Sequence, residues 1–508
     1  MKFLTVFALV VMTAVPAFSL NGPTKVEVTP PAPKFTDAER QSELAKRRAA
    51  VAAKMLDNSV LILLSAEPKL YTNDVDYVYR QENNLYYLTA LKQDGAKLVI
   101  QKYGGKVTET LYLPKRVPMR EAWEGKMYSV EQATAISGIT TVKDTLDSVS
   151  FTALLRAPKA DPAFTENIYL LLPQNENDDN GKREFAMEND LATRISSYKV
   201  INAQPIFAEL RHIKSPYEIK LLQHAIDITT EAQMRSMATV GRASWEYEVH
   251  AEVEYTFRRR NADFWGYPSI VGCGANATTL HYVESQSPVE KGELLLMDVG
   301  AEYEHYTADV TRTYPVNGKF TKEQAEIYQI VYDAQEAVAK ATKPGVTFGQ
   351  LSSIASNTVR DGLFKLGLVT DKISNQHRIW FIHGLGHWLG MNVHDVGDYS
   401  AKLAPGMVFT NEPGIYIRED ALDNLPNTPE MNAFKEKVRP AFEKYKNIGV
   451  RIEDDLLVTE SGVSWMTGKL PRSIADIEAF MAVAPKHVTL SRSLDSNIFT
   501  NGMLERAE

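Results

Sequence analysis

The sequence predicts a mixed α/β (α+β) protein with two domains, and three observations support this. The chain has 508 residues, which is more than one ordinary core requires. Short apolar runs typical of strands alternate with helical patterns up to about Tyr198. A strong helix start at Ser215 then opens a second half in which apolar runs end in acidic residues. We place the domain boundary near residues 195–210.

The first half begins with a helix. Thr36-Asp37-Ala38-Glu39 is a capping-box pattern, so we expect a helix that continues to about Met55. Apolar and aromatic runs then predict strands at 60–64, 85–89, 97–100 and 109–113.

The second half opens with the helix start at Ser215. Ser215 is the predicted cap, Pro216 occupies the first helical position, and Glu218 completes the capping box. This helix should continue to about Thr239. A second long helix is predicted from Thr321 to the Lys-Pro-Gly sequence at 343–345.

Composition excludes several classes of protein. Hydrophobic residues make up 44% and charged residues 24% of the chain, as in soluble globular proteins. The net charge of −8 and the lack of a Lys/Arg block argue against nucleic acid as a partner. Cys273 is the only cysteine, so no intrachain disulfide can form.

The first 19 residues have the pattern of a secretory signal. Lys2 precedes an almost wholly apolar stretch, and Ala17-Phe18-Ser19 offers a small-residue cleavage site. A membrane anchor is the alternative, but about 16 apolar residues are fewer than the roughly 20 that a spanning helix needs. We therefore expect an exported protein, periplasmic or secreted, that is free of the membrane after cleavage. Residues 20–35, rich in proline, should form an extended linker.

Two aspartates in the second half indicate a site for a cation. An apolar run ends in Asp298, and Asp309 follows eleven residues later. A hairpin of that length can bring both carboxylates to one level of a sheet. Because a buried carboxylate is costly alone, two that converge suggest a shared cation. An ordinary hairpin with two exposed acids is the alternative.

Three further groups supply possible metal ligands. His383 and His387 lie in the glycine-rich sequence HGLGHWLG, which favours a tight turn over a helix. This sequence is not a zincin motif, because Gly384 stands where HExxH requires Glu. Glu412 and Glu453 each follow a predicted strand. Each group alone is typical of ordinary turns, but together they indicate a metal centre.

The order and wording of these groups resemble the dinuclear-metal pita-bread peptidases, the family of Xaa-Pro aminopeptidases (aminopeptidase P) and prolidases. The stretches VDYVYRQ at 75–81 and YYLT at 86–89 are similar to the N-terminal domain of aminopeptidase P. The resemblance implies an N-terminal α/β domain over 36–200 and a pita-bread (creatinase/aminopeptidase-like) catalytic domain over 205–490. It also implies a homo-oligomer, either a dimer or a tetramer.

The resemblance also implies roles for individual residues. Two divalent metal ions would be held by Asp298, Asp309, His387, Glu412 and Glu453. The substrate site would be lined by His281, His383 and His394, with support from Arg451. The sequon at Asn276 lies within this site segment and is read as structural, without a glycan.

The implied reaction is release of the N-terminal residue from peptides with proline in second position. Two ions would bridge and deprotonate one water, and the resulting hydroxide would attack the carbonyl before proline. Glu412 is the candidate for passing the proton of the water to the leaving nitrogen, and His383 or His394 the candidate for hydrogen-bonding the oxyanion or the product. Four carboxylates and one imidazole form a hard ligand set, which favours Mn²⁺ over Zn²⁺.

Three alternatives remain at this stage. A prolidase would cleave only dipeptides and would need a basic group for the terminal carboxylate. The stretch 398–407 has no Arg, although Lys402 offers a point charge. A creatinase-like hydrolase and a catalytically inactive binding module would both be expected to lack metal ligands, and none is missing here.

Overall fold

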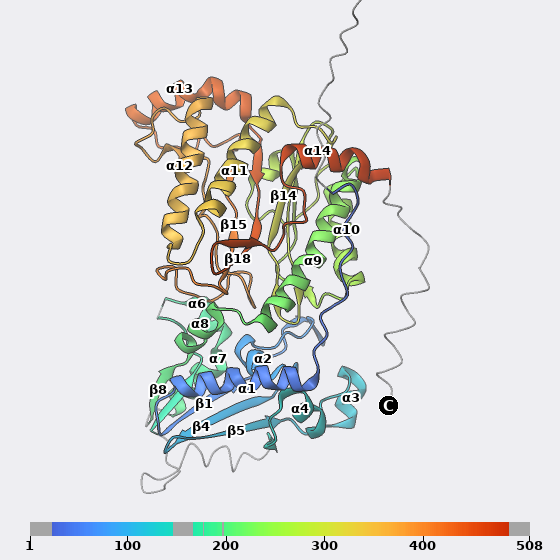
Figure 1. The fold of residues 1–508 in the computed structure, drawn as a ribbon, viewed down its shortest axis with the longest axis vertical. Helices are drawn as coiled ribbons and strands as arrows, with labels where there is room; N and C mark the ends of the chain where they lie inside the picture. The colour runs from blue at the N-terminus through green and yellow to red at the C-terminus, as the bar shows by residue number, and fades with distance from the viewer. Residues whose placement is uncertain (1–22, 146–165, 176, 196–197, 487–508) are drawn as a thin grey trace, which may run out of the picture.

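The computed structural model describes residues 23–145, 166–175, 177–195 and 198–486, so the predicted signal segment lies outside the described residues. The chain forms two domains, one above the other in Figure 1, with the N-terminal domain at the bottom. No helix in these described ranges is long and apolar enough to cross a membrane.

The N-terminal domain is built on a six-stranded mixed sheet with the order β6-β5-β4-β1-β7-β8. Its strands are β1 (Ser59–Leu64), β4 (Lys97–Tyr103), β5 (Lys106–Leu113), β6 (Val142–Asp144), β7 (Asn167–Leu170) and β8 (Lys199–Asn202). Every residue of β1 is buried, which explains its continuous apolar run. The strands predicted at 60–64, 97–100 and 109–113 are thus confirmed.

Helices and one small hairpin surround this sheet. The hairpin pairs β2 (Leu70–Thr72) with β3 (Val75–Asp76). The helices are α1 (Asp37–Lys54), α3 (Pro118–Glu124), α4 (Val130–Ser137), α6 (Asp179–Glu184), α7 (Ala186–Arg194) and α8 (Gln204–His212). The predicted capping box of α1 is present, with Thr36 and Glu39 bonded to each other's backbone.

The strand predicted at 85–89 is wrong, because these residues belong to helix α2 (Asn83–Thr89). Glu82 caps the helix by accepting hydrogen bonds from the backbone N–H groups of Asn84 and Leu85. All seven residues of α2 are buried. A helix that is buried all round has no amphipathic period, so its sequence resembles a buried strand.

The predicted linker is held against the C-terminal domain. Thr29 bonds to the Glu231 carboxylate through both its backbone N–H and its hydroxyl, at 2.7 and 2.6 Å. Arg260 pairs with the same carboxylate. Figure 1 shows this N-terminal segment running beside α9 (Pro216–Thr239) and α10 (Glu246–Arg259) before α1 begins.

The C-terminal domain places helices outside short antiparallel sheets, as expected of a pita-bread domain. One sheet has the order β10-β11-β14 and another β15-β18-β19, and smaller sheets pair β13-β12-β9 and β16-β17. The strands are β9 (Phe264–Trp265), β10 (Ile270–Cys273), β11 (Leu294–Val299), β12 (Ala301–Tyr303), β13 (Tyr306–Thr307), β14 (Val310–Pro315), β15 (Val408–Asn411), β16 (Gly414–Tyr416), β17 (Gly449–Arg451), β18 (Asp454–Val458) and β19 (Val463–Trp465). The remaining helices are α11 (Lys322–Ala341), α12 (Phe348–Leu366), α13 (Pro429–Tyr445) and α14 (Ile474–Val483).

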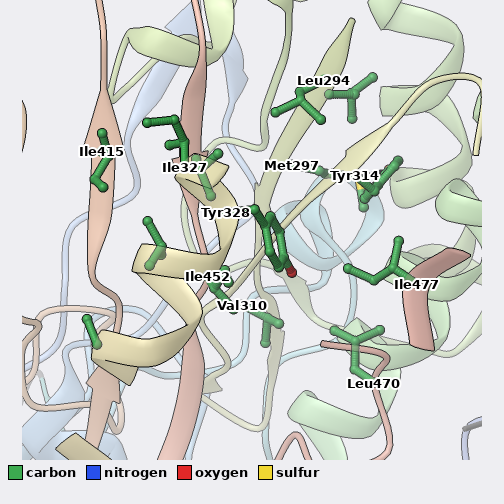
Figure 2. Packing of buried hydrophobic residues seen from close by; sticks show 14 of the residues in the cluster. Leu294, Met297, Val310, Tyr314, Ile327, Tyr328, Ile415, Ile452, Leu470 and Ile477 are labelled. Carbon is green, nitrogen blue, oxygen red and sulfur yellow. Dashed lines mark hydrogen bonds between the residues drawn. The ribbon is translucent and has the colours of Figure 1, made fainter. Parts of the chain in front are cut away.

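Both helix starts predicted in this half are confirmed. Ser215 and Glu218 form the capping box of α9, and Thr321 and Gln324 form that of α11. The apolar face of α11 then packs on the sheet. Figure 2 shows Ile327 and Tyr328 of α11 near Met297 and Tyr314, with Ile477 of α14 close by.

A second apolar cluster joins the two domains. It contains Leu61 from the first sheet, Leu85 and Leu88 from α2, and Tyr306 and Leu389 from the C-terminal half. Since burial of each such side chain contributes about 1.5–3 kcal/mol, this cluster alone accounts for firm contact between the domains.

Close packing of α11 against α12 predicts the effect of Gly362→Ala. A Cβ at Gly362 would lie 2.6 Å from two side-chain carbons of Ile330, so the helices must shift. We expect a loss of about 1–3 kcal/mol in the free energy of unfolding. Gly349→Ala in the same helix is the matched control, since nothing lies within 4 Å of its Cβ position. Urea unfolding of both variants measures this, and equal stabilities would contradict the packing argument.

Candidate metal centre

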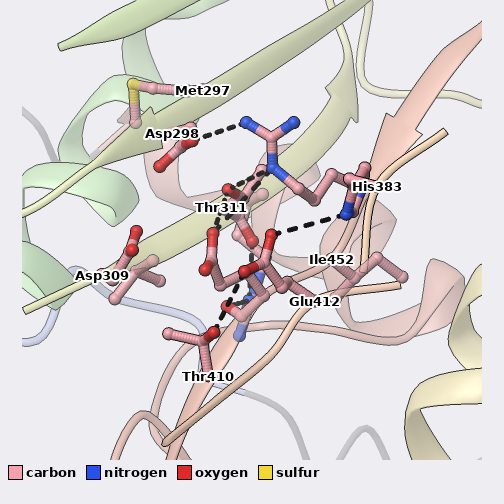
Figure 3. Close-up of polar contacts among 12 residues, drawn as sticks. Met297, Asp298, Asp309, Thr311, His383, Thr410, Glu412 and Ile452 are labelled. Carbon is pink, nitrogen blue, oxygen red and sulfur yellow. Dashed lines mark hydrogen bonds and ion pairs between the residues drawn. The ribbon is translucent and has the colours of Figure 1, made fainter. Parts of the chain in front are cut away.

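One pocket of about 560 Å³ gathers the candidate site residues. All nine line it: Asp298, Asp309, His387, Glu412, Glu453, His281, His383, His394 and Arg451. They come from segments spread over more than 150 positions of the chain. Figure 3 shows Asp298, Asp309, His383 and Glu412 of this group.

Asp298 and Asp309 converge through strand register. β11 pairs with β14 antiparallel, with Asp298 opposite Thr311. Asp309 lies two residues before Thr311, so the two aspartates are diagonal neighbours on one face of the sheet. The hydroxyl of Tyr267 lies 2.6 Å from an oxygen of each carboxylate. A single hydroxyl proton can serve only one of them at a time, so this arrangement leaves negative charge for a cation.

His387 and Glu412 are brought together by a glycine. The segment around His387 runs beside β15, and its backbone exchanges bonds with Thr410. A Cβ at Gly386 would lie 2.1 Å from the backbone oxygen of Thr410, so only glycine permits this approach. The Nε2 atom of His387 lies 3.2 Å from Asp309 and 3.4 Å from Glu412. Its Nδ1 lies 3.1 Å from the backbone oxygen of Trp388, to which it donates, which leaves Nε2 as a ligand atom.

Glu453 enters from the junction between β17 and β18. Its backbone N–H donates to the carbonyl of Thr311, and the Thr311 hydroxyl donates to its carboxylate at 2.6 Å. Asp309, His387 and Glu453 each offer a ligand atom within 4.8 Å of the others. These three form the tightest group, and Asp298 and Glu412 flank it.

The charges in this pocket favour bound cations. Burial and the nearby carboxylates raise the pKa of Asp309, raise that of Glu412 to about 7, and hold that of Glu453 well above its usual range. Burial alone would lower the pKa of His387, but Asp309 and Glu412 raise it to about 9. The carboxylates therefore attract protons strongly. Divalent cations would relieve the same repulsion, so the donor set fits two metal ions.

Arg451 balances part of this charge and connects to His383. Its guanidinium bonds to Asp298 at 2.5 Å and to the hydroxyl of Tyr416 at 2.8 Å. That hydroxyl lies 2.8 Å from Nε2 of His383, whose Nδ1 lies 2.8 Å from the Gly384 oxygen. His383 is thus neutral and donates from Nδ1; burial first, and then Arg451, lower its pKa to about 3.

The two remaining histidines lie differently in the pocket. His281 is exposed at its rim. The His394 ring packs edge-on against His387, with centroids 4.2 Å apart. Within the described residues His394 makes no hydrogen bond through its ring, so both ring nitrogens remain available for a substrate. Of the two candidates for hydrogen-bonding an oxyanion, the geometry favours His394 over His383.

Lys402 is not among the residues that line the pocket. It is exposed and pairs in a β-bridge with Thr347. The point charge considered for a dipeptide carboxylate is therefore placed outside the described pocket.

The sequence analysis did not predict four residues that contact the candidate ligands or their neighbours. Thr311 and Thr410 bond to Glu453 and Glu412, and each stands two residues from a ligand along a strand. Strand alternation could have found them, because residues two apart share a face. Tyr267 and Tyr416 carry no such signal. The predicted structural role of Asn276 agrees with its amide contacts to Glu246 and Ser287.

Comparison with protein families gives two matches. Residues 220–460 match the model of metallopeptidase family M24, and residues 44–160 match the aminopeptidase P N-terminal domain. A Xaa-Pro aminopeptidase of Haemophilus influenzae is 36% identical, covering 87% of this chain and 97% of that protein. Human Xaa-Pro aminopeptidase 3 is 33% identical, and the match covers 90% of this chain and 88% of the human protein.

Solved structures agree with these matches. The low-pH form of aminopeptidase P from Escherichia coli superimposes with a TM-score of 0.75 at 31% identity, over 89% of this chain and all of that one. A zinc-substituted form of the same enzyme in complex with product superimposes with a TM-score of 0.73 at 31% identity, over 87% of this chain and 98% of that one.

The shared contact of Tyr267 predicts the effect of Tyr267→Phe. Removing the hydroxyl leaves Asp298 and Asp309 without their common donor, so the orientation of one carboxylate relative to the other is less restricted. We expect metal affinity to fall by roughly 10- to 100-fold. Tyr314→Phe is the matched control. Tyr314 is buried on β14, and its hydroxyl lies 3.8 Å from the Met297 sulfur instead of contacting a carboxylate. Equal metal affinities in the two variants, measured by titration, would contradict the role given to Tyr267.

Proposed function

We propose, from the premise that this chain belongs to metallopeptidase family M24 and carries an aminopeptidase P N-terminal domain, that it is a Xaa-Pro aminopeptidase. It releases the N-terminal residue of peptides with proline in second position. The observation that carries this proposal is the pocket in which four carboxylates meet the imidazole of His387. A peptide bond to proline lacks an N–H and is held by a rigid ring, which calls for a dedicated site.

The residues that would hold two divalent ions are Asp298, Asp309, His387, Glu412 and Glu453. When bound, such ions lower the pKa of a water and polarise a carbonyl oxygen. We propose Mn²⁺ as the native ion, because oxygen donors outnumber the single imidazole nitrogen.

Side chains of the protein then transfer the proton and position the substrate and the candidate ligands. Glu412, oriented by the Thr410 hydroxyl at 3.0 Å, takes the proton of the attacking water and passes it to the nitrogen of proline. His394 donates a hydrogen bond to the carbonyl oxygen of the scissile bond. Arg451 holds Asp298 in place and, by its bond to Tyr416, positions the Tyr416 hydroxyl beside Nε2 of His383.

The pocket suits peptides longer than two residues. Apolar side chains of Leu280, Val283 and Val393 line it beside the histidines, and Arg451 is the cation among its lining residues. Because Arg451 is already bonded to Asp298, it is not free to bind the terminal carboxylate of a dipeptide. We propose preference for tripeptides and longer substrates.

Metal dependence separates the ligands from the other histidines. We expect chelators to abolish activity and Mn²⁺ to restore it best. Asp309→Ala and His387→Ala should lose metal and lower kcat by roughly 100-fold or more, whereas His394→Ala should lower kcat with metal content unchanged. Glu460→Ala, an exposed acid after β18, is the control. Metal analysis beside kinetics checks this; loss of metal from His394→Ala but not from His387→Ala would reverse the assignment.

Substrate length distinguishes this proposal from a prolidase. We expect kcat/KM to be higher for an Xaa-Pro peptide extended at its C-terminus than for the Xaa-Pro dipeptide with the same first residue. The physical reason is that the dipeptide's carboxylate finds no free cation in the pocket. A clear preference for the dipeptide would make the protein a prolidase.

From the first 19 residues we propose that the protein is exported, to the periplasm or as a secreted protein. From its family we also propose a homo-oligomer, either a dimer or a tetramer. Mature protein from the native source should begin near Leu20, because signal peptidase cleaves after small residues. N-terminal sequencing measures this, with sedimentation giving the subunit number. An intact Met1 on the native protein would rule out cleavage.

A further inference from the structure

The loop that carries His394 has no regular secondary structure of its own. Residues 390–395 contain neither helix nor strand. Within the loop's own backbone the bonds are few: Asp395 N–H donates to Trp388, and Gly390 N–H donates to Asn392. Since the ring of His394 makes no hydrogen bond among the described residues, other groups must fix its place.

Asp395, the next residue, is held by two buried cations. Arg211 lies 2.5 Å and Lys214 lies 3.3 Å from its carboxylate, and all three side chains are at most 3% exposed. A buried pair of this kind is costly to break, because loss of one partner leaves an uncompensated charge.

Residues of the N-terminal domain add further hydrogen bonds to the loop and to Arg211. Asn84 accepts a hydrogen bond from Arg211 at 2.8 Å, and Asn83 donates to the side chain of Asn392 at 2.7 Å. Arg80 donates to the carbonyl of Met391 at 2.8 Å and to Asn83 at 2.9 Å. We call Arg80, Asn83, Asn84 and Arg211 the loop anchor.

The loop anchor acts through the loop and not on the substrate. None of its four residues lines the described pocket. General adhesion between the domains does not require it, because the apolar cluster around Tyr306 and Leu389 already joins them. Its polar contacts reach Met391, Asn392 and Asp395, on either side of His394. Outside the loop, Arg80 pairs with Glu302 and Asn83 contacts His305.

We propose that the N-terminal domain positions His394 for catalysis through the loop anchor, so that Asn83 and Asp395 are positioning residues of the active site. The proposal rests on the proposed function in that His394 serves peptide cleavage. It assigns Arg80, Asn83 and Asn84, in the sequence Arg-Gln-Glu-Asn-Asn at 80–84, a role in positioning the active-site loop.

A double-mutant cycle in the full-length protein tests this. Asn83→Ala removes the bond to Asn392, the bond that Asn83 accepts from Arg80 and a 3.4 Å contact with Nδ1 of His305. Arg80 keeps Glu302 as its ion-pair partner, so no charge is left unpaired. We expect it to lower kcat by roughly 10-fold or more with metal content unchanged, because small misplacement of a catalytic group is costly. In a His394→Ala background it should cause no further loss. Asn392→Ala, which removes the other partner of the same bond, should behave alike.

The matched control is Arg48→Ala. Arg48 is buried in the same domain, but it bonds to Glu109 and to backbone oxygens of Leu88 and Ser137, away from the loop. Its effect on kcat should be small and the same with or without His394. An effect of Asn83→Ala that is equally large in both backgrounds, or a loss of metal from that variant, would overturn the proposal.

Amide hydrogen exchange gives a reading independent of activity. Asn83→Ala should speed exchange in residues 390–395 but not in 408–411 of β15, since only the loop depends on the anchor. Unchanged exchange in the loop would overturn the proposal even if the enzyme is active. Inactivity of the wild-type protein on Xaa-Pro peptides, with the loop loosened as expected, would instead overturn the proposed function alone.

Discussion

Repulsion among four carboxylates, three of them buried and that of Glu412 partly buried, is the constraint on which the rest of the structure depends. Asp298, Asp309, Glu412 and Glu453 lie in one pocket, and burial together with their mutual charge raises the pKa of three of them. A fold can hold such a group only if each side chain is fixed by rigid neighbours and a cation compensates the charge. The sheets supply the first condition, and the donor set fits metal ions for the second.

The surrounding polar groups follow from this constraint. Arg451 is bonded to Asp298, and hydroxyl groups of Tyr267, Thr311 and Thr410 contact the other ligands. Each of these side chains comes from a strand, or from a segment held beside one. The backbone under the site is therefore stiff, and the apolar contacts of α11 behind β11 and β14 keep the strands in register. Stability of the core and geometry of the metal centre are in this sense one property.

The histidines of the pocket depend less on the sheets. His387 is fixed by the close approach that Gly386 permits, but His394 projects from an irregular loop. Long-range contacts with the N-terminal domain substitute for secondary structure there. This explains why a domain that contributes nothing to the described pocket lining contacts the loop beside it so closely.

The sequence by itself determined which residues gather at the candidate metal centre and the type of most elements. Capping boxes at Ser215 and Thr321, apolar runs ending in Asp298, and the glycines around His387 are local signals, and local signals can be read from a single chain. Only the tertiary structure decided that 83–89 is a helix, that Tyr267 joins Asp298 to Asp309, and that Asn83 contacts Asn392 across 309 positions. Such contacts follow from packing between distant segments, which leaves no periodic trace in the sequence around either partner.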